Sequence, residues 1–289
     1  MIPYLVNGIV IGAIYGVVAL GVVLVYKGSR AVNFAHGEMG MIAAFVVLSL
    51  WFESGWNFYL AALLGLAASG LAGFLTERFV VRRFQGGSTL TILVATLAVA
   101  GILQFVGAEI WGLDPKFITA PAESIGGWEG IRTGDVVLTI PRLIVIIAAI
   151  ILSAALWVLF RRTSFGLAFR GTAIDGYAAK LCGINVSRIS SITWTLGAVL
   201  SGIAAILVAP LVSFHVFFMT LLFIRALAAA LVAGLTNLGA AFGAGVFIGI
   251  AESYLVKFTS QAGAVEAALF ALIVVLLAVR PRGLVAAEY

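Results

Sequence analysis

Long apolar runs follow one another from the first residues of the chain to the last. With about 20 apolar residues per membrane crossing, candidate spans lie at roughly 5–26, 34–51, 58–78, 90–108, 142–160, 190–212, 216–235, 239–256 and 264–279. The runs are continuous rather than alternating, which favours helices over an outer-membrane barrel. Only 10% of the 289 residues are charged, against about 25% in soluble domains. We therefore expect an all-α membrane protein: one domain over residues 1–289, a polytopic bundle of roughly 8–10 transmembrane or re-entrant helices.

The basic residues predict how the bundle lies in the membrane. The chain carries 17 Lys and Arg against 12 Asp and Glu, a formal net charge of +5. If the N-terminus starts outside and the spans alternate, most of these basic residues fall on one side, which the positive-inside bias makes cytoplasmic. This assigns the segment at about 161–189 and the C-terminus to the cytoplasm, and the loop at about 109–141 to the outside. The charge thus indicates orientation, and we expect no nucleic-acid partner.

Small residues recur at four-residue spacing in two of the spans. They form Gly8-x-x-x-Gly12-x-x-x-Gly16 in the first and Gly239-x-x-x-Gly243 near the end. Such spacing lets helix backbones approach closely within a membrane. We expect both patterns to be packing surfaces.

Four ionisable residues stand inside apolar runs or at their edges: Glu38, Arg225, Glu252 and Glu266. A charge at the centre of a membrane helix costs ~3 kcal/mol on insertion scales, so it usually faces the bundle interior or a water-filled path. The pattern points to transport. For Glu252, Glu266 and nearby Lys257, solvation at a membrane interface is the alternative interpretation.

The block Asn33-Phe34-Ala35-His36-Gly37-Glu38 separates the first two runs. We expect Asn33 to cap a helix, Gly37 to allow close approach, and Glu38 to sit in a first turn, where the helix dipole favours a carboxylate. A helix that begins within the protein is a device of transporters, as a joint or as part of a gate. The residues assigned to a translocation pathway or gate are Asn33, His36, Glu38 and Arg225.

Catalytic and cofactor motifs are missing from the sequence. It has no Gly-rich phosphate loop with its lysine, so we expect no ATP hydrolysis by this chain. Two histidines and one cysteine cannot form an ordinary structural zinc site, and we expect neither metal nor cofactor here. An acid–base pair of His36 and Glu38 would suit a membrane enzyme, but residues two apart on a helix lie about 200° from each other.

The segment 161–189 contains a second informative pattern. Apolar residues at helical spacing predict one face of a short helix outside the bilayer, ending at Gly183. They are Ile174, Tyr177, Ala178 and Leu181. Such a helix could lie on the membrane surface or dock into a partner; a simple linker with a helical turn is the alternative.

Three stretches in order resemble one known family. The N-terminal stretch from Gly12 to Ala44 with its Asn-Phe-Ala-His-Gly-Glu block, the loop AAKLCGINVSRI and the C-terminal VRPRGL are similar to the permease subunits of branched-chain amino acid ABC importers, the LivH type. The resemblance spans nearly the whole chain. It implies a bacterial inner-membrane importer that translocates leucine, isoleucine, valine or a related small polar solute.

The resemblance also implies partners. These are a second permease subunit, either a related paralogue or the same chain, two cytoplasmic ATP-binding subunits that use ATP and Mg, and a periplasmic solute-binding protein. The segment 161–189 would then couple the permease to the ATP-binding subunit. Its best-matched residues are Ala178, Ala179, Gly183, Ile184, Asn185 and Arg188.

Some positions depart from the family pattern. Ala233 stands where a glycine is expected, and Arg170-Gly171 where Arg-Ala is common. Relatives with the same block import urea, short amides or aromatic acids, so these solutes are alternatives. A stand-alone transporter that uses Glu38 and Arg225 for ion coupling is a further one.

Overall fold

The computed structural model describes residues 2–84, 88–119, 131–133, 136–235 and 237–258, with isolated positions between 263 and 278. Within these residues, six helices are long and apolar enough to cross a membrane. They are α1 (Ile2–Ser29), α3 (Phe58–Leu75), α4 (Thr89–Trp111), α5 (Ile140–Arg162), α8 (Val186–Val208) and α10 (Leu238–Phe258). The expectation of a polytopic α-helical membrane protein is therefore confirmed. The predicted span 264–279, with Glu266, lies largely outside the described residues.

Shorter elements complete the described chain. Helix α2 (His36–Val47) continues as a π-helix, Leu48–Glu53. Helix α3 continues as a π-helix, Thr76–Val80, which is followed by a 3₁₀ turn, Val81–Phe84. Helix α8 ends in a 3₁₀ turn, Ala209–Leu211. Helices α6 (Ser164–Ile174) and α7 (Gly176–Leu181) follow α5, and α9 (Phe218–Val232) precedes α10. Strands β1 (Ile131–Thr133) and β2 (Val136–Leu138) pair antiparallel, a small hairpin that the sequence did not predict.

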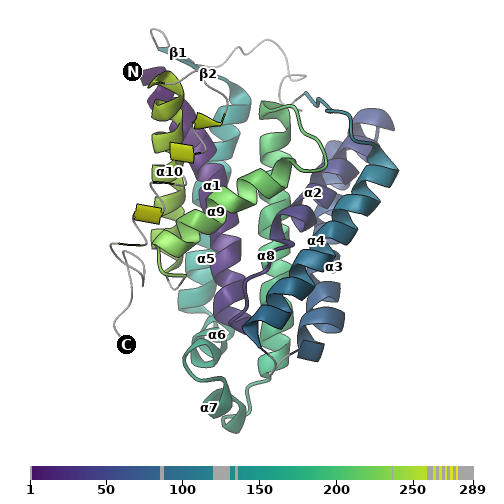
Figure 1. The fold of residues 1–289 in the computed structure, drawn as a ribbon, viewed down its shortest axis with the longest axis vertical. Coiled ribbons are helices and arrows are strands. Elements are labelled where there is room, and N and C mark those ends of the chain that lie inside the picture. The colour runs from purple at the N-terminus through teal and green to yellow at the C-terminus, as the bar shows by residue number, and fades with distance from the viewer. Residues whose placement is uncertain are drawn as a thin grey trace.

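Helix α9 is too short to cross the bilayer as a straight helix. Its 15 residues span about 22 Å, less than the ~30 Å hydrocarbon core. It runs obliquely across the middle of the molecule, past α1 and towards α2 and α8 (Figure 1). The run 216–235, expected as a span, is therefore an oblique internal helix that reaches several neighbours.

Helix α1 lies at the centre, with 89% of its most apolar stretch buried. It packs closely along α10, as the glycine spacing in α1 predicted: a Cβ on Gly12 would lie 2.7 Å from the Val246 backbone, and one on Gly8 2.6 Å from that of Ile250. The expectation that Gly239 and Gly243 form a packing surface was wrong within the described residues, because a Cβ on Gly243 would have no neighbouring atom within 4 Å and one on Gly239 would meet only Asn237. The glycines of α10 that face α1 are Gly245 and Gly249.

Candidate functional site

Glu38 is the centre of a buried polar cluster that joins three helices. Its carboxylate lies in the first turn of α2, as predicted, and the residue is 2% exposed. Gln104 on α4 donates to its Oε1 at 2.9 Å, and Thr220 on α9 donates to the same oxygen at 2.7 Å. The other oxygen, Oε2, is buried without a hydrogen-bond partner among the described residues. A carboxylate at membrane depth is thus held by two neutral donors.

The joint before α2 is built largely as predicted, with one correction. Asn33 is buried, and its side-chain oxygen accepts a hydrogen bond from the backbone N–H of Ala35 at 3.0 Å. The N-cap position is Ala35, which has no side-chain capping bond, so Asn33 tightens the turn ahead of the helix instead of capping it. Gly37 does allow close approach, because a Cβ there would lie 2.7 Å from the Met219 carbonyl oxygen at the start of α9.

His36 lies beside Glu38 in sequence but not in space. Its fully buried ring packs between α1 and α8, where a Cβ on Gly21 would lie 2.7 Å from the ring. Neither ring nitrogen has a hydrogen-bond partner among the described residues. The His36 carbonyl accepts a hydrogen bond from Ser201 at 2.8 Å. The structure gives the two side chains separate surroundings and no shared acid–base contact.

Arg225 belongs to a second cluster. It forms an ion pair with Glu252 on α10 at 2.9 Å, and the Tyr15 hydroxyl on α1 donates to the same carboxylate at 2.7 Å. The two charged side chains are 19% and 15% exposed. Protein groups thus partner the Glu252 carboxylate, and its solvation at an interface stays an alternative prediction. Helix α9 contributes to both clusters, with Thr220 at Glu38 and Arg225 at Glu252.

The segment 161–189 ends in a protruding helix. Helix α7 lies at the end of the molecule, beyond the lower ends of the long helices (Figure 1). The Asp175 side chain caps it by accepting from the N–H groups of Tyr177 and Ala178, at 2.8 and 3.0 Å. Gly183 has φ +81°, so the predicted helix end at this glycine is confirmed.

The six residues assigned to coupling differ in accessibility. Ala178, Gly183, Asn185 and Arg188 are exposed, Ile184 is half-buried and Ala179 is buried. Asn185 caps α8 by accepting from the N–H of Arg188 at 3.0 Å. The predicted apolar face is outward: Ile174, Tyr177 and Leu181 are each about 70% exposed. Ala179 therefore packs inward and supports the helix, while its neighbours form the free surface.

Comparison with known proteins identifies the family. A family model described as branched-chain amino acid transport system / permease component matches residues 4–279. The chain belongs to this family. The resemblance seen in the three sequence stretches is thereby confirmed.

Named relatives of this permease match along most of its length. It is 29% identical to the high-affinity branched-chain amino acid transport system permease protein BraD of Pseudomonas aeruginosa, over 97% of this chain and 94% of that protein. It is 25% identical to the corresponding LivH of Escherichia coli K12, over 96% and 93%. The fructose import permease protein FrcC of Rhizobium meliloti is 23% identical over 66% of this chain. The solved PsaBC complex of Streptococcus pneumoniae aligns with a TM-score of 0.48 and 15% identity.

The sequence analysis of this permease missed three site residues. Gln104, Thr220 and Tyr15 complete the two clusters, yet each is a neutral polar residue within an apolar run. A search for amide and hydroxyl side chains in the spans would have raised them as candidates. In the described part of the chain, no three His, Cys, Asp or Glu side chains lie close enough to hold a metal ion.

Proposed function

We propose that this chain is the membrane-spanning permease subunit of an ABC importer in the bacterial inner membrane. It translocates branched-chain amino acids, leucine, isoleucine and valine, and ATP hydrolysis in partner subunits powers the movement. The observation that carries the proposal is the match to BraD and LivH over more than nine-tenths of this chain and of theirs. The six long apolar helices fit a multi-pass subunit.

The partners in this proposal are two cytoplasmic ATP-binding subunits, a second permease subunit and a periplasmic binding protein that delivers the solute. The chain contributes the path and the mechanical coupling, and the ATP-binding subunits contribute ATP and Mg. In this arrangement the C-terminus and the segment 161–189 face the cytoplasm. The outward apolar residues of α7 support this assignment, because an ATP-binding subunit would cover them.

Within the permease, we assign Asn33, His36, Glu38 and Arg225 to the pathway or its gate. Support comes from the meeting of two helix N-termini, those of α2 and α9, at the Glu38 carboxylate. Both helices begin inside the protein, the arrangement with which broken-helix transporters form substrate sites and gates. Motion of α7, driven by the ATP-binding subunits, would reach this joint through α8, which contacts α2.

The decisive experiment is uptake by the whole complex. The chain is reconstituted with its ATP-binding subunits, second permease and binding protein in vesicles, and uptake of labelled leucine is measured with and without ATP. ATP-dependent leucine uptake supports the proposal. Uptake of urea, an amide or an aromatic acid instead would assign the alternative solutes, and uptake driven by an ion gradient without ATP would favour the stand-alone transporter.

Coupling is tested by Gly183→Pro with a matched control. Gly183 has φ +81° and its N–H donates to the Lys180 carbonyl, so proline removes both the turn and the bond. Gly112 has φ +80° and donates to the Ala108 carbonyl in the same way at the end of α4. We expect Gly183→Pro to lower ATP-driven uptake at least about tenfold, equivalent to 1.4 kcal/mol or more of lost coupling. Gly112→Pro should keep most of it; equal losses would remove α7 from the coupling path.

A further inference from the structure

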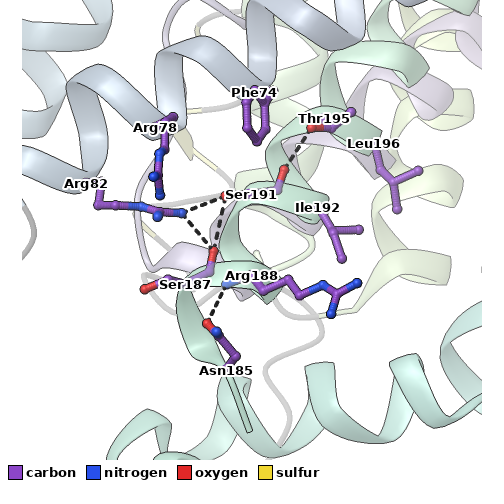
Figure 2. Close-up of a pocket in the computed structure, with 10 residues that line it drawn as sticks. All are labelled: Phe74, Arg78, Arg82, Asn185, Ser187, Arg188, Ser191, Ile192, Thr195 and Leu196. Atoms are coloured by element: carbon purple, nitrogen blue, oxygen red, sulfur yellow. Dashed lines mark hydrogen bonds between the residues drawn. The ribbon is translucent and has the colours of Figure 1, made fainter.

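A basic pocket lies where α3 ends beside the start of α8, apart from both polar clusters. It has a volume of about 700 Å³ and is lined by Phe74, Arg78, Arg82, Asn185, Ser187, Arg188, Ser191, Ile192, Thr195 and Leu196. Three of these residues are arginines and none is acidic. The pocket therefore presents positive charge at the end of the bundle where α7 protrudes (Figures 1 and 2).

One of the three arginines is fixed by a buried acid. Arg82 donates to Glu77 at 3.0 Å, to the Ser191 hydroxyl at 2.8 Å and to the Ser187 carbonyl at 3.2 Å. The Glu77 side chain is 0% exposed and the Arg82 side chain 26%. Glu77 thus neutralises Arg82 and attaches α3 to α8, and Figure 2 shows Arg82 reaching across to both serines.

The charges of the other two arginines have no such counterpart. Arg78 and Arg188 are exposed, and no hydrogen bond or ion pair of either guanidinium is found among the described residues. Arg78 lies within the π-helical turn Thr76–Val80, a local widening of the helix that often marks functional sites. The pocket therefore keeps a net positive charge and two guanidinium groups that are available to an anion.

The surface above the pocket is apolar. Large apolar side chains near Arg78, on α3 and the π-helix that continues it, are exposed, namely Leu71, Phe74, Leu75 and Phe79. Phe74 also forms part of the pocket wall, to the right of Arg78 in Figure 2. A ligand that fits both features has an apolar tail along α3 and an anionic head at the arginines.

We propose that this pocket binds the phosphate headgroup of an anionic membrane phospholipid. Guanidinium groups match phosphate oxygens through paired N–H donors, and basic pockets between helices at the membrane surface suit anionic lipid heads. The exposed strip on α3 selects the lipid over free phosphate, which has no tail to bury. Since the Glu77–Arg82 pair attaches α3 to α8, a lipid bound at Arg78 would brace the helix that leads to the coupling segment.

Lipid titration of the purified full chain tests the proposal. Native mass spectrometry in detergent would compare phosphatidylglycerol with phosphatidylcholine of the same chains. We expect preferential binding of phosphatidylglycerol, weakened about five- to tenfold in Arg78→Gln by the loss of one headgroup contact. Arg78→Lys keeps the charge but loses the paired donors, so its loss should be smaller. Arg162→Gln removes an exposed charge from the end of α5 and should change binding less than about twofold.

Several results would overturn the lipid assignment. If Arg78→Gln and Arg162→Gln weakened phosphatidylglycerol binding equally, only the general surface charge would matter. If phosphatidylglycerol and phosphatidylcholine bound equally, the pocket would not distinguish their headgroups. Displacement of phosphatidylglycerol by millimolar inorganic phosphate would reassign the pocket to a soluble phosphate. If Arg78→Gln kept its lipid binding but no longer bound the ATP-binding subunit, the pocket would be reassigned to a contact between proteins. None of these measurements requires transport, so the test of lipid binding would remain valid even if the proposed import function proved wrong.

Discussion

Glu38 and Glu252 are two carboxylates inside the same bundle with opposite surroundings. Glu252 meets a full positive charge, Arg225 at 2.9 Å, and a tyrosine hydroxyl at 2.7 Å. Glu38 meets only an amide and a hydroxyl, Gln104 and Thr220, and keeps one oxygen without a partner among the described residues. Each carboxylate thus has two partners, but the more deeply buried Glu38 has no charged partner among the described residues.

Helix α9 connects these two clusters. Thr220 and Arg225 are five residues apart, hence about 140° apart around the helix, so one faces α2 and α4 while the other faces α1 and α10. Removing one partner of a buried charged pair costs about 3–5 kcal/mol, whereas a hydrogen bond from a neutral donor to a carboxylate contributes about 1.5 kcal/mol. The α1–α9–α10 side, with Arg225, is therefore the costlier contact to break, and the α2–α4–α9 side is the part that can rearrange at lower cost per contact.

The largest expected effect comes from breaking the ion pair. Arg225→Met leaves the Glu252 carboxylate with its charge uncompensated, and removal of one partner of a buried pair destabilises by on the order of 3 kcal/mol. The free energy of unfolding of the detergent-solubilised protein measures it. Adding Glu252→Gln to Arg225→Met should recover most of the loss, because the charge is then gone. A double variant as unstable as the single would show that Arg225 stabilises through other contacts.

A smaller effect is expected from Tyr15→Phe. The change removes the hydrogen bond to Glu252 and leaves the ring, over which the Arg225 guanidinium lies 5.9 Å from the centroid. A hydrogen bond to a charged group contributes about 1.5 kcal/mol, and unfolding measurements should find a loss of that size. Tyr59→Phe is the matched control, because Tyr59 is 78% exposed and should change stability little. Similar losses in both variants would contradict the role of the Tyr15 hydroxyl.

The sequence predicted the elements that depend on local pattern. Eight of the nine expected spans correspond to described helices, the helix end at Gly183 is in place, and Glu38 occupies the first turn of its helix. These features follow from apolar run length, backbone conformation and helix polarity, which neighbouring residues determine. The assignment of Asn33 as a cap failed by two positions, because helix ends depend on the exact path of the turn.

Contacts between distant helices could not be predicted in the same way. Gln104 and Thr220 reach Glu38 from 66 and 182 residues away, and nothing near Glu38 in sequence indicates them. Helix α10 carries glycines on more than one face, so its spacing pattern selected Gly243 although Gly245 and Gly249 meet α1. Which face is used depends on how the helices are rotated against one another, and one sequence does not contain that information.

The smallest expected effect on stability, and the sharpest test of the comparison, is Glu38→Gln. The amide oxygen can still accept from Gln104 and Thr220, and the new NH₂ group replaces the oxygen that has no partner in the described structure, so the loss should be about 1 kcal/mol or less. Glu252→Gln, the same chemical change, leaves Arg225 without its carboxylate partner and should cost on the order of 3 kcal/mol. Unfolding measurements on both variants compare them directly.

Transport gives Glu38→Gln its second readout. If the Glu38 cluster is the joint that rearranges, the variant should assemble with its partners and keep ATP turnover while leucine uptake falls several-fold, because the balance between the two arrangements of α2 has changed. A stable variant with unchanged uptake would make Glu38 a simple packing group at a helix start. If Glu38→Gln were as unstable as Glu252→Gln, a positive charge would have to stabilise the Glu38 carboxylate. The difference between the two clusters would then no longer indicate which side of α9 can rearrange.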